Sequence, residues 1–421
     1  MEVALLLVLL VVVVAAVSAL ARRLGLPAPL LLTLVGVAGS LVPFVPEVKL
    51  SAQVVLIGLL PPLLYAAAIR TSLIDFRANR RAIALLSVGL VLFTAVGVGL
   101  VAHWLLPISL PTAFALGAVV APPDAVAATA IARRIGMPRR IVSILEGESL
   151  VNDATALVAL RTAIVALGGS FALVGVALDF LLAAGGGVVV GLAVAYLAAQ
   201  VRRRIHDTVL DTALSLIIPF GAYLAAEEIH ASGVLAVVVT GLILGHKAPV
   251  IQNAASRISE STNWRTIQFL LENTVFLLIG LQVRSIVTNV GRSALGLDQI
   301  LLACALILLT VIVLRPIWVF PTTYLPRLIP VVRRVDPPPS WQYPAVVSWA
   351  GMRGVVTLAT VFVLPEDLPH REVLVLAALV VTAGTLLIQG FTLPVLVRGL
   401  GLRGPDPRED LLQEAAVMHE A

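Results

Sequence analysis

The sequence predicts an all-α polytopic membrane protein with 13 transmembrane helices. Three observations predict this fold class: the apolar composition, the number of long apolar segments, and the distribution of basic residues between them. Of the 421 residues, 59% are hydrophobic and 13% are charged, whereas a soluble domain usually carries about 25% charged residues. A soluble fold of this size could not hide so much apolar surface. The single cysteine, Cys304, excludes a disulfide framework.

The apolar segments are the first element of this prediction. A helix needs about 20 apolar residues to cross the hydrocarbon core of a bilayer, and thirteen segments are apolar over about this length. The first has no basic residue before it, so we expect a retained span and not a cleaved signal peptide. The expected spans are 3–21, 28–45, 51–69, 82–106, 111–132, 141–167, 171–200, 208–229, 232–246, 266–283, 299–325, 344–364 and 373–397.

The basic residues test this count independently, because loops on the cytoplasmic side of a membrane are enriched in Lys and Arg. With the N-terminus outside, most of the 29 Lys and Arg residues fall in the inside loops. The C-terminus is then cytoplasmic, and the net charge of +5 is a topology signal that does not predict a nucleic-acid partner. The exceptions are Lys49, Arg284, Arg292 and Arg371 in outside loops, and Arg161, Arg315 and Arg353 within spans.

The fifth segment contains a break. Pro122 and Pro123 stand side by side near its middle, where two N–H donors are missing and the rings clash with the preceding turn. In a membrane, such a break survives only where it is buried in protein or lines a cavity. Asp124 follows where the helix restarts, and free N–H groups there favour an anion. Asp124 is expected either to belong to a site at this break or only to cap the second half-helix.

The sixth segment has a continuous polar face. Glu148 and Asn152 are four residues apart, and so are Ser149 and Asp153, so helical spacing places them on two neighbouring stripes. This face cannot point to lipid, because ionisable groups inside a membrane are unfavourable unless they are paired or hydrated. Two interpretations remain: a hydrogen-bond cluster between helices, or a functional site that includes Asp153.

Two arginines are expected in the membrane near these carboxylates. Arg315, in the eleventh segment, stays charged and needs a carboxylate, and Glu148 is the expected partner. Alternatively, Arg315 extends along its helix to the inner surface. Arg353, in the twelfth segment, lies between Gly351 and Gly354. This pattern predicts a second weak point in a helix, although glycines also serve ordinary helix packing.

The two interrupted segments, the fifth and the twelfth, are seven positions apart and therefore run in opposite directions. Interrupted segments at matching positions of two inverted halves indicate a transporter binding site. Segments one to six and eight to thirteen would form two inverted six-helix repeats, with the seventh between them. Where the two broken helices cross, Arg353 is expected to compensate the half-helix dipoles and Asp124.

Other polar residues give weaker signals. Glu272 and Asn273 open an apolar run and are expected to line an ion path or to pair with an arginine. Asp179 and Arg161 are expected near the outer surface. The histidines lack the spacing of metal ligands; they are His103, His206, His230, His246, His370 and His419.

These residues resemble the monovalent cation:proton antiporter family, in its NhaP-like branch, which is related to the eukaryotic sodium/proton exchangers. The resemblance covers essentially all thirteen segments, and the motif of the sixth segment is its most specific part. The motifs are PDAVA (123–127), EGESLVNDATA (146–156), ENTVFLLIGL (272–281), Arg315 and GMRG (351–354).

The resemblance implies a plasma-membrane homodimer in which a mobile core moves against a dimerisation domain. Within residues 1–403, the dimerisation part would comprise spans 1–3 and 8–10, and the core spans 4–6 and 11–13. Residues 404–421 would form a short cytoplasmic tail. No cofactor is implied; the expected partners are protons, a monovalent cation and the lipid bilayer.

The resemblance also implies a sodium site. Asp153 would bind the ion, helped by Ser149 and the unwound backbone at Pro123, with Asp124 nearby, and Asn152 would be held by the Glu148–Arg315 pair. One departure concerns selectivity: many relatives have a glutamate after the aromatic residue of the third segment, and here Ala66 follows Tyr65. The threonine that relatives have before Asp124 is here Pro123, which offers only its carbonyl.

The resulting hypothesis is competition of one proton and one cation for Asp153, because a carboxylate that holds a proton cannot also hold a cation. With Asn152 in place of a second aspartate, exchange is expected to be electroneutral. A potassium/proton or broad monovalent cation/proton exchanger is the nearest alternative. More distant alternatives are a channel and an intramembrane hydrolase with Asp124 and Asp153, or Ser149, at its active site.

Overall fold

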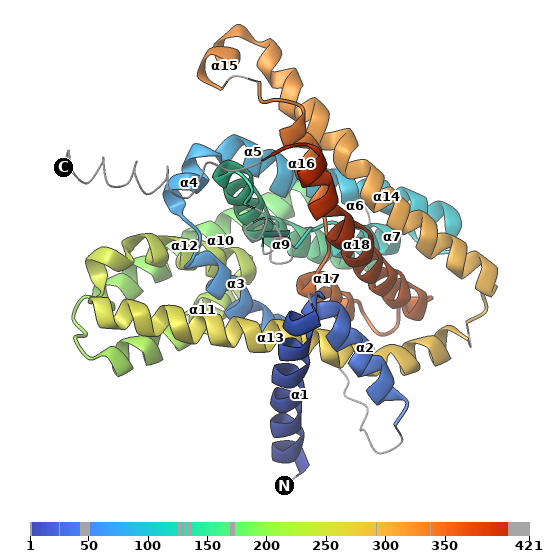
Figure 1. The fold of residues 1–421 in the computed structure, drawn as a ribbon, viewed down its shortest axis with the longest axis horizontal. Coiled ribbons are helices and arrows are strands. Elements are labelled where there is room, and N and C mark those ends of the chain that lie inside the picture. The colour runs from blue at the N-terminus through green and yellow to red at the C-terminus, as the bar shows by residue number, and fades with distance from the viewer. Residues whose placement is uncertain are drawn as a thin grey trace.

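The computed structural model describes residues 2–24, 26–42, 51–124, 128, 129, 132, 136–168, 173–291, 293–336 and 338–402. Every regular element within these ranges is helical (Figure 1). Two π-helical stretches, Val54–Leu59 and Leu85–Leu90, lead into α3 and α6, and short 3-10 turns, Leu325–Leu328 and Val361–Val363, follow α14 and α17. The α-helices are α1 (Glu2–Leu24), α2 (Ala28–Ser40), α3 (Leu60–Ala68), α4 (Leu73–Ala78), α5 (Arg80–Ala84), α6 (Val91–Leu105), α7 (Leu110–Val120), α9 (Arg139–Leu167), α10 (Leu173–Arg202), α11 (Thr208–Glu228), α12 (Gly233–Ile251), α13 (Ala254–Val290), α14 (Leu297–Tyr324), α15 (Pro330–Val335), α16 (Gln342–Trp349), α17 (Val355–Thr360) and α18 (Arg371–Gly399).

Eight helical segments in the described ranges are long and apolar enough to cross a membrane. They comprise the continuous α5–α6 segment, α9, most of α10, α11, α12, α13, α14 with its 3-10 extension, and α18. The structure therefore agrees with an all-helical polytopic membrane protein. The other predicted spans contain helices that are shorter, interrupted or only partly described, so the count of thirteen remains a prediction. The predicted tail, 404–421, lies outside the described residues.

Helix packing divides into two groups. In one, α2 packs on α13, and α12 packs on α3, α10 and α11; in the other, α7 packs on α6 and α9, and α14 packs on α6, α16 and α18. Small residues allow the closest approaches, as is common for helices in membranes. A Cβ atom on Gly36 of α2 would lie 2.8 Å from the Cα of Gly280 in α13, so both helices depend on glycine at this crossing.

Helix α13 corrects one predicted boundary. It begins at Ala254, well before the predicted start of this span at residue 266, and it continues to Val290. Asn253 caps it by accepting a hydrogen bond from the Ser256 N–H at 2.7 Å, which satisfies a donor that the first turn leaves unpaired. The early turns are polar, so hydropathy alone did not locate them, and they carry the buried Glu260.

Candidate functional site

Both predicted breaks lie where the sequence places them, and they touch each other. Helix α7 ends at Val120, and residues 121–124 are not helical. Pro122 and Pro123 cannot donate to the preceding turn, and the N–H of Asp124 bonds to the Met352 carbonyl at 2.6 Å instead of continuing the helix. Met352 belongs to the non-helical stretch 350–354 between α16 and α17. Each break thus supplies a partner for the other.

Arg353 binds the carbonyls that the first break leaves without helical donors. Its side chain is 1% exposed, and it donates from Nε to the Val120 carbonyl at 3.0 Å and from Nη2 to the Ala121 carbonyl at 3.2 Å. Nη1 donates to the Gly351 carbonyl. A guanidinium at the C-terminal end of α7 lies where the helix dipole favours a positive charge.

Gly354 permits the contact between Asp124 and the second break. A Cβ atom at this position would collide with the Asp124 side chain, so only glycine leaves room for the carboxylate here. The sequence showed this glycine as a weak point in a helix; the structure adds a steric reason for it. Residues 125–127 lie outside the described ranges, so the predicted restart of the helix after Asp124 does too.

Arg315 and Glu148 form the ion pair that the sequence favours. Nη1 and Nη2 of Arg315 donate to the two carboxylate oxygens of Glu148 at 2.5 and 2.8 Å, and Nε donates to the Val347 carbonyl at 3.0 Å. Both side chains are 1% exposed. This burial is incompatible with the alternative in which Arg315 extends to the membrane surface. The bidentate geometry links α9 to α14 and neutralises Glu148.

Asn152 differs from its predicted contact. The resemblance implied that the Glu148–Arg315 pair holds it, but its Nδ2 donates to the Pro123 carbonyl at 2.9 Å, and its Oδ1 has no hydrogen-bond partner among the described residues. Arg315 already donates to Glu148 and a backbone carbonyl, whereas the Pro123 carbonyl lies in the break and outside any helical ladder. Asn152 therefore connects α9 to the broken segment. The Pro123 carbonyl keeps a second lone pair for another donor or a cation.

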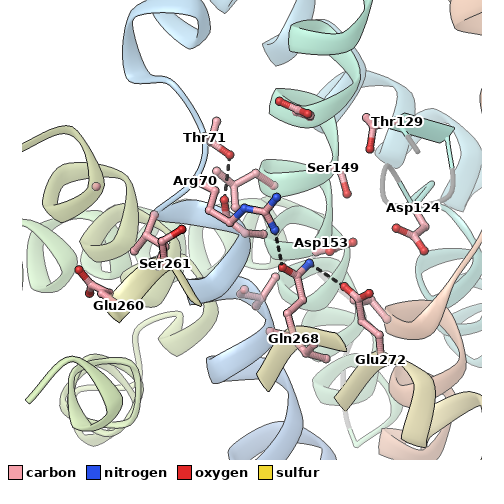
Figure 2. Close-up of a pocket in the computed structure, with 18 of the residues that line it drawn as sticks. Arg70, Thr71, Asp124, Thr129, Ser149, Asp153, Glu260, Ser261, Gln268 and Glu272 are labelled. Atoms are coloured by element: carbon pink, nitrogen blue, oxygen red, sulfur yellow. Dashed lines mark hydrogen bonds between the residues drawn. The ribbon is translucent and has the colours of Figure 1, made fainter. Parts of the chain in front are cut away.

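A cavity of about 670 Å³ opens beside this crossing, lined by Asp124, Ser149 and Asp153 on one side and by Gln268 and Glu272 of α13 on the other (Figure 2). Asp153 is 7% exposed. Within the described part of the chain, the structure gives no ion pair or hydrogen bond for its side chain. Carboxylate and hydroxyl oxygens of this kind suit a hard cation.

A hydrogen-bonded chain crosses the cavity wall opposite Asp153. Arg70, just after α3, donates from Nη1 to Oε1 of Gln268 at 3.1 Å, and Nε2 of Gln268 donates to Oε1 of Glu272 at 2.7 Å. Glu272 thus lines the cavity, and within the described residues it is linked to Arg70 through the amide of Gln268 (Figure 2). Arg70 and Gln268 were not predicted as site residues, because Arg70 follows the third expected span and Gln268 lies at the polar start of the tenth, where polar residues usually face solvent.

The remaining candidates lie away from this cavity. Asn273, adjacent to Glu272, is buried and donates to the Phe269 carbonyl of its own helix. Arg161 is partly exposed and pairs with Glu227 at 2.7 Å, and the side chain of Asp179 lies outside the described residues. Among the residues that the structure describes, no three His, Cys, Asp or Glu side chains are grouped to hold a metal ion.

A further buried arginine, Arg202, was missed by the sequence interpretation. Arg202 was expected in an inside loop, but it is 1% exposed and donates to both oxygens of Asp211 at 2.7 and 2.9 Å. It also donates to both oxygens of Glu260, each at 3.0 Å. Gln252 donates to one oxygen of each carboxylate at 2.7 and 2.8 Å. The cluster joins α10, α11 and α13, and Gln252 and Glu260 reach the cavity wall.

Comparisons with known proteins agree with this architecture. The transmembrane sodium/hydrogen exchanger family matches residues 8–399. An uncharacterised sodium/proton exchanger of Mycobacterium tuberculosis is 35% identical over 90% of this chain and 71% of its own length. The antiporter ApNhaP of Aphanothece halophytica is 32% identical over 90% of this chain and 70% of its own length.

A sodium, potassium, lithium and rubidium/proton antiporter of Bacillus pumilus is 32% identical over 88% of this chain and 58% of its own length. The solved structure of the sodium/proton antiporter MjNhaP1 of Methanocaldococcus jannaschii at pH 8 has the same fold. Its TM-score is 0.77 at 20% identity, over 96% of this chain and 99% of that one. These relatives are transporters and not enzymes, which removes the hydrolase alternative. The chain therefore belongs to the sodium/hydrogen exchanger family of membrane antiporters.

Proposed function

We propose that the protein is a secondary active sodium/proton antiporter in which one Na⁺ and one proton compete for Asp153. The observation that supports this most directly is the state of the two carboxylates on the inner face of α9. Glu148 is neutralised by Arg315, whereas Asp153 lines the cavity next to Ser149 and Asp124. A buried carboxylate without a permanent cation needs an exchangeable one or a proton.

We propose that Asp153, Asp124 and the Ser149 hydroxyl supply oxygen ligands for the transported Na⁺, with the Pro123 carbonyl beside them. Asn152 does not titrate, and its amide donates to that carbonyl, so the pair Asn152–Asp153 carries one proton at most. One Na⁺ for one proton makes the exchange electroneutral.

We infer alternating access in which a core moves against a scaffold. The two packing groups support this division, because the cavity lies between α9 in one group and α13 in the other. In this proposal, spans 1–3 and 8–10 form the dimerisation scaffold of a homodimer, and spans 4–6 and 11–13 form the core, related as two inverted repeats of a thirteen-span fold. The positive-inside rule supports an outside N-terminus and a cytoplasmic C-terminus in the plasma membrane.

A broader cation range is the second candidate function. The Bacillus pumilus relative that exchanges sodium, potassium, lithium and rubidium supports it, and so does Ala66. Ala66 is buried in α3 and offers no oxygen. Selectivity between cations depends on the number of ligands and the size of the site, so the loss of one carboxylate ligand broadens the range of monovalent cations.

Reconstituted liposomes that contain a pH-sensitive dye test both candidates. Wild-type protein should move protons when Na⁺ is added, whereas Asp153→Asn should fall to the level of protein-free liposomes. Asp367→Asn is the matched control, because this exposed loop aspartate is remote from the cavity and its loss should leave exchange unchanged. Retained exchange in Asp153→Asn would refute the site.

The same liposomes distinguish the cations and the stoichiometry. Parallel additions of Na⁺, Li⁺ and K⁺ separate a sodium exchanger from one of broad specificity. An imposed membrane potential should leave the initial rate unchanged, because one charge moves in each direction. A rate that follows the potential would overturn the electroneutral assignment while leaving Asp153 as the site.

A further inference from the structure

A second, smaller cavity lies outside the transport site, at the membrane face where α9 begins and α14 ends. It measures about 80 Å³ and is lined by Arg81, Arg140, Arg327 and Asp336 together with apolar residues. We call these four residues the basic pocket. Arg81 is on α5, Arg140 opens α9, and the other two lie in the connection after α14, near α15 at the top of Figure 1.

The basic pocket already binds one anionic group of the protein itself. The carboxylate of Asp336 accepts from Nη2 of Arg140 at 3.0 Å and from Nη2 of Arg327 at 2.5 Å. Arg327 also donates from Nε to the Asp336 backbone carbonyl at 3.2 Å. Two guanidinium groups that converge on one carboxylate form a geometry that equally suits phosphate oxygens.

The charges of the basic pocket do not balance. Three arginines face one carboxylate, and in the part of the chain that the structure describes, the Arg81 side chain has no hydrogen bond or ion pair. Arg140 is half exposed, with 48% of its side chain accessible. Arg81 and Arg140 therefore have donors left for an anion, whereas Arg327 is 11% exposed and held by Asp336 and the Thr323 carbonyl.

The surroundings of the basic pocket are apolar. Its wall includes Leu85, Leu86, Ile144, Val319 and Val347. The adjoining connection exposes large apolar side chains: Leu325 is 61% exposed, Leu328 75%, Ile329 55% and Trp341 58%. In a membrane protein, exposed tryptophan marks the level of the lipid headgroups, and exposed leucine and isoleucine suit the acyl chains next to them. The acyl chains of a phospholipid would pack against these apolar side chains, whereas a soluble anion would gain nothing from contact with them.

We propose that the basic pocket binds the phosphate of an anionic phospholipid from the adjacent leaflet, with Arg81 and Arg140 donating to it. Basic pockets between transmembrane helices are known to bind anionic headgroups. Asp336 acts as a tethered competitor that occupies part of the phosphate position. Arg140 lies in the first turn of α9, the helix of Asp153, and Arg327 follows α14, the helix of Arg315, so a bound lipid would contact the ends of both helices.

Lipid-dependent thermal unfolding of the purified, delipidated full-length chain tests this inference, with phosphatidylglycerol as the probe and phosphatidylcholine as each variant's own baseline. Wild type should be stabilised by phosphatidylglycerol over phosphatidylcholine. Arg81→Gln should weaken the apparent affinity about fivefold, from the usual contribution of one arginine to anionic-lipid binding. This variant breaks no side-chain hydrogen bond or ion pair of the described structure, so it should fold normally.

Asp336→Asn gives a change of opposite sign. Without the competing carboxylate, phosphatidylglycerol should bind several-fold more tightly than to wild type. The matched control is Arg203→Gln with Arg204→Gln: these exposed arginines follow α10 and lie outside the basic pocket, and their loss should leave the lipid response unchanged.

Three results would overturn the proposal. The first is an equal loss of the phosphatidylglycerol response in Arg81→Gln and in the Arg203/Arg204 control, which indicates unspecific surface charge. The second is unchanged or weaker lipid binding in Asp336→Asn, which indicates that Asp336 is only a structural clamp. The third is the same stabilisation by inorganic phosphate as by phosphatidylglycerol, which assigns the pocket to a soluble anion.

Discussion

Arg315 and Arg202 are both buried with carboxylates, in the two different packing groups of the molecule. Arg315 pairs with Glu148 alone, whereas Arg202 binds Asp211 and Glu260 together. In both clusters every carboxylate oxygen accepts a hydrogen bond from a guanidinium. Asp153, one turn beyond Glu148 on the same helix, has no such donor within the described residues.

This difference separates structural charges from exchangeable ones. A carboxylate that is permanently neutralised by arginine has no need of a second cation, because its desolvation is already offset. A carboxylate that lacks this partner takes a proton or a metal ion from the cavity. The Arg202 cluster thus resembles the Glu148–Arg315 pair in chemistry and differs from Asp153 in function, although all lie near one cavity.

Replacing Arg202 with methionine should have the largest effect on stability. It leaves Asp211 and Glu260 buried without their cation, and breaking a buried ion pair in this way costs about 3–5 kcal/mol. Thermal unfolding in detergent measures the loss. The exchange rate per folded molecule, and its dependence on Na⁺, should change little. Loss of sodium dependence in the folded fraction would show that this cluster takes part in exchange.

Replacing Asn152 with alanine should have an intermediate effect. The Pro123 carbonyl loses the donor that holds it, and a buried polar group left unsatisfied costs about 1–3 kcal/mol. Because the break borders Asp153, exchange should fall as well. Asn152→Asp should be at least as harmful, since a carboxylate cannot donate to that carbonyl unless it is protonated. Wild-type stability in Asn152→Ala would show that this hydrogen bond is unimportant.

Glu272→Gln should have the smallest effect and should leave stability unchanged. Glu272 faces the same cavity as Asp153, and its hydrogen-bond partner within the described residues is the neutral amide of Gln268. Removing its charge should raise the apparent KM for Na⁺ about fivefold, the effect of one charge a few ångströms away in a hydrated space. Asp367→Asn serves as the charge-matched control. If exchange is abolished, the prediction is wrong, and Glu272 is a required ligand of the cation.

The sequence predicted those features that follow from local chemistry. Two consecutive prolines must break a helix wherever they stand, and an intramembrane arginine must find a carboxylate, so Arg315 could be matched with Glu148. The Arg202 cluster could not be predicted in the same way. Asp211 and Glu260 lie at the polar ends of apolar segments, where charges normally face solvent, and only the early start of α13 brings Glu260 to Arg202.

Asn152 shows a second limit of sequence interpretation. The family resemblance implied a contact with the Glu148–Arg315 pair, and helical spacing reports only residues on the same helix. The Pro123 carbonyl that binds it belongs to another segment, and its orientation depends on how the two breaks pack. Every residue has a backbone carbonyl, so the sequence does not show which carbonyl is free to accept a hydrogen bond. Such contacts can be identified only in the folded structure.

The initial rate of exchange as a function of Na⁺ concentration, measured across a pH series in proteoliposomes, tests the central claim most directly. If one proton and one Na⁺ share Asp153, lowering the pH should raise the apparent KM for Na⁺ and leave the maximal rate unchanged. The rise approaches about tenfold per pH unit once the competing proton dominates. A constant KM with a maximal rate that falls on acidification would contradict a shared site.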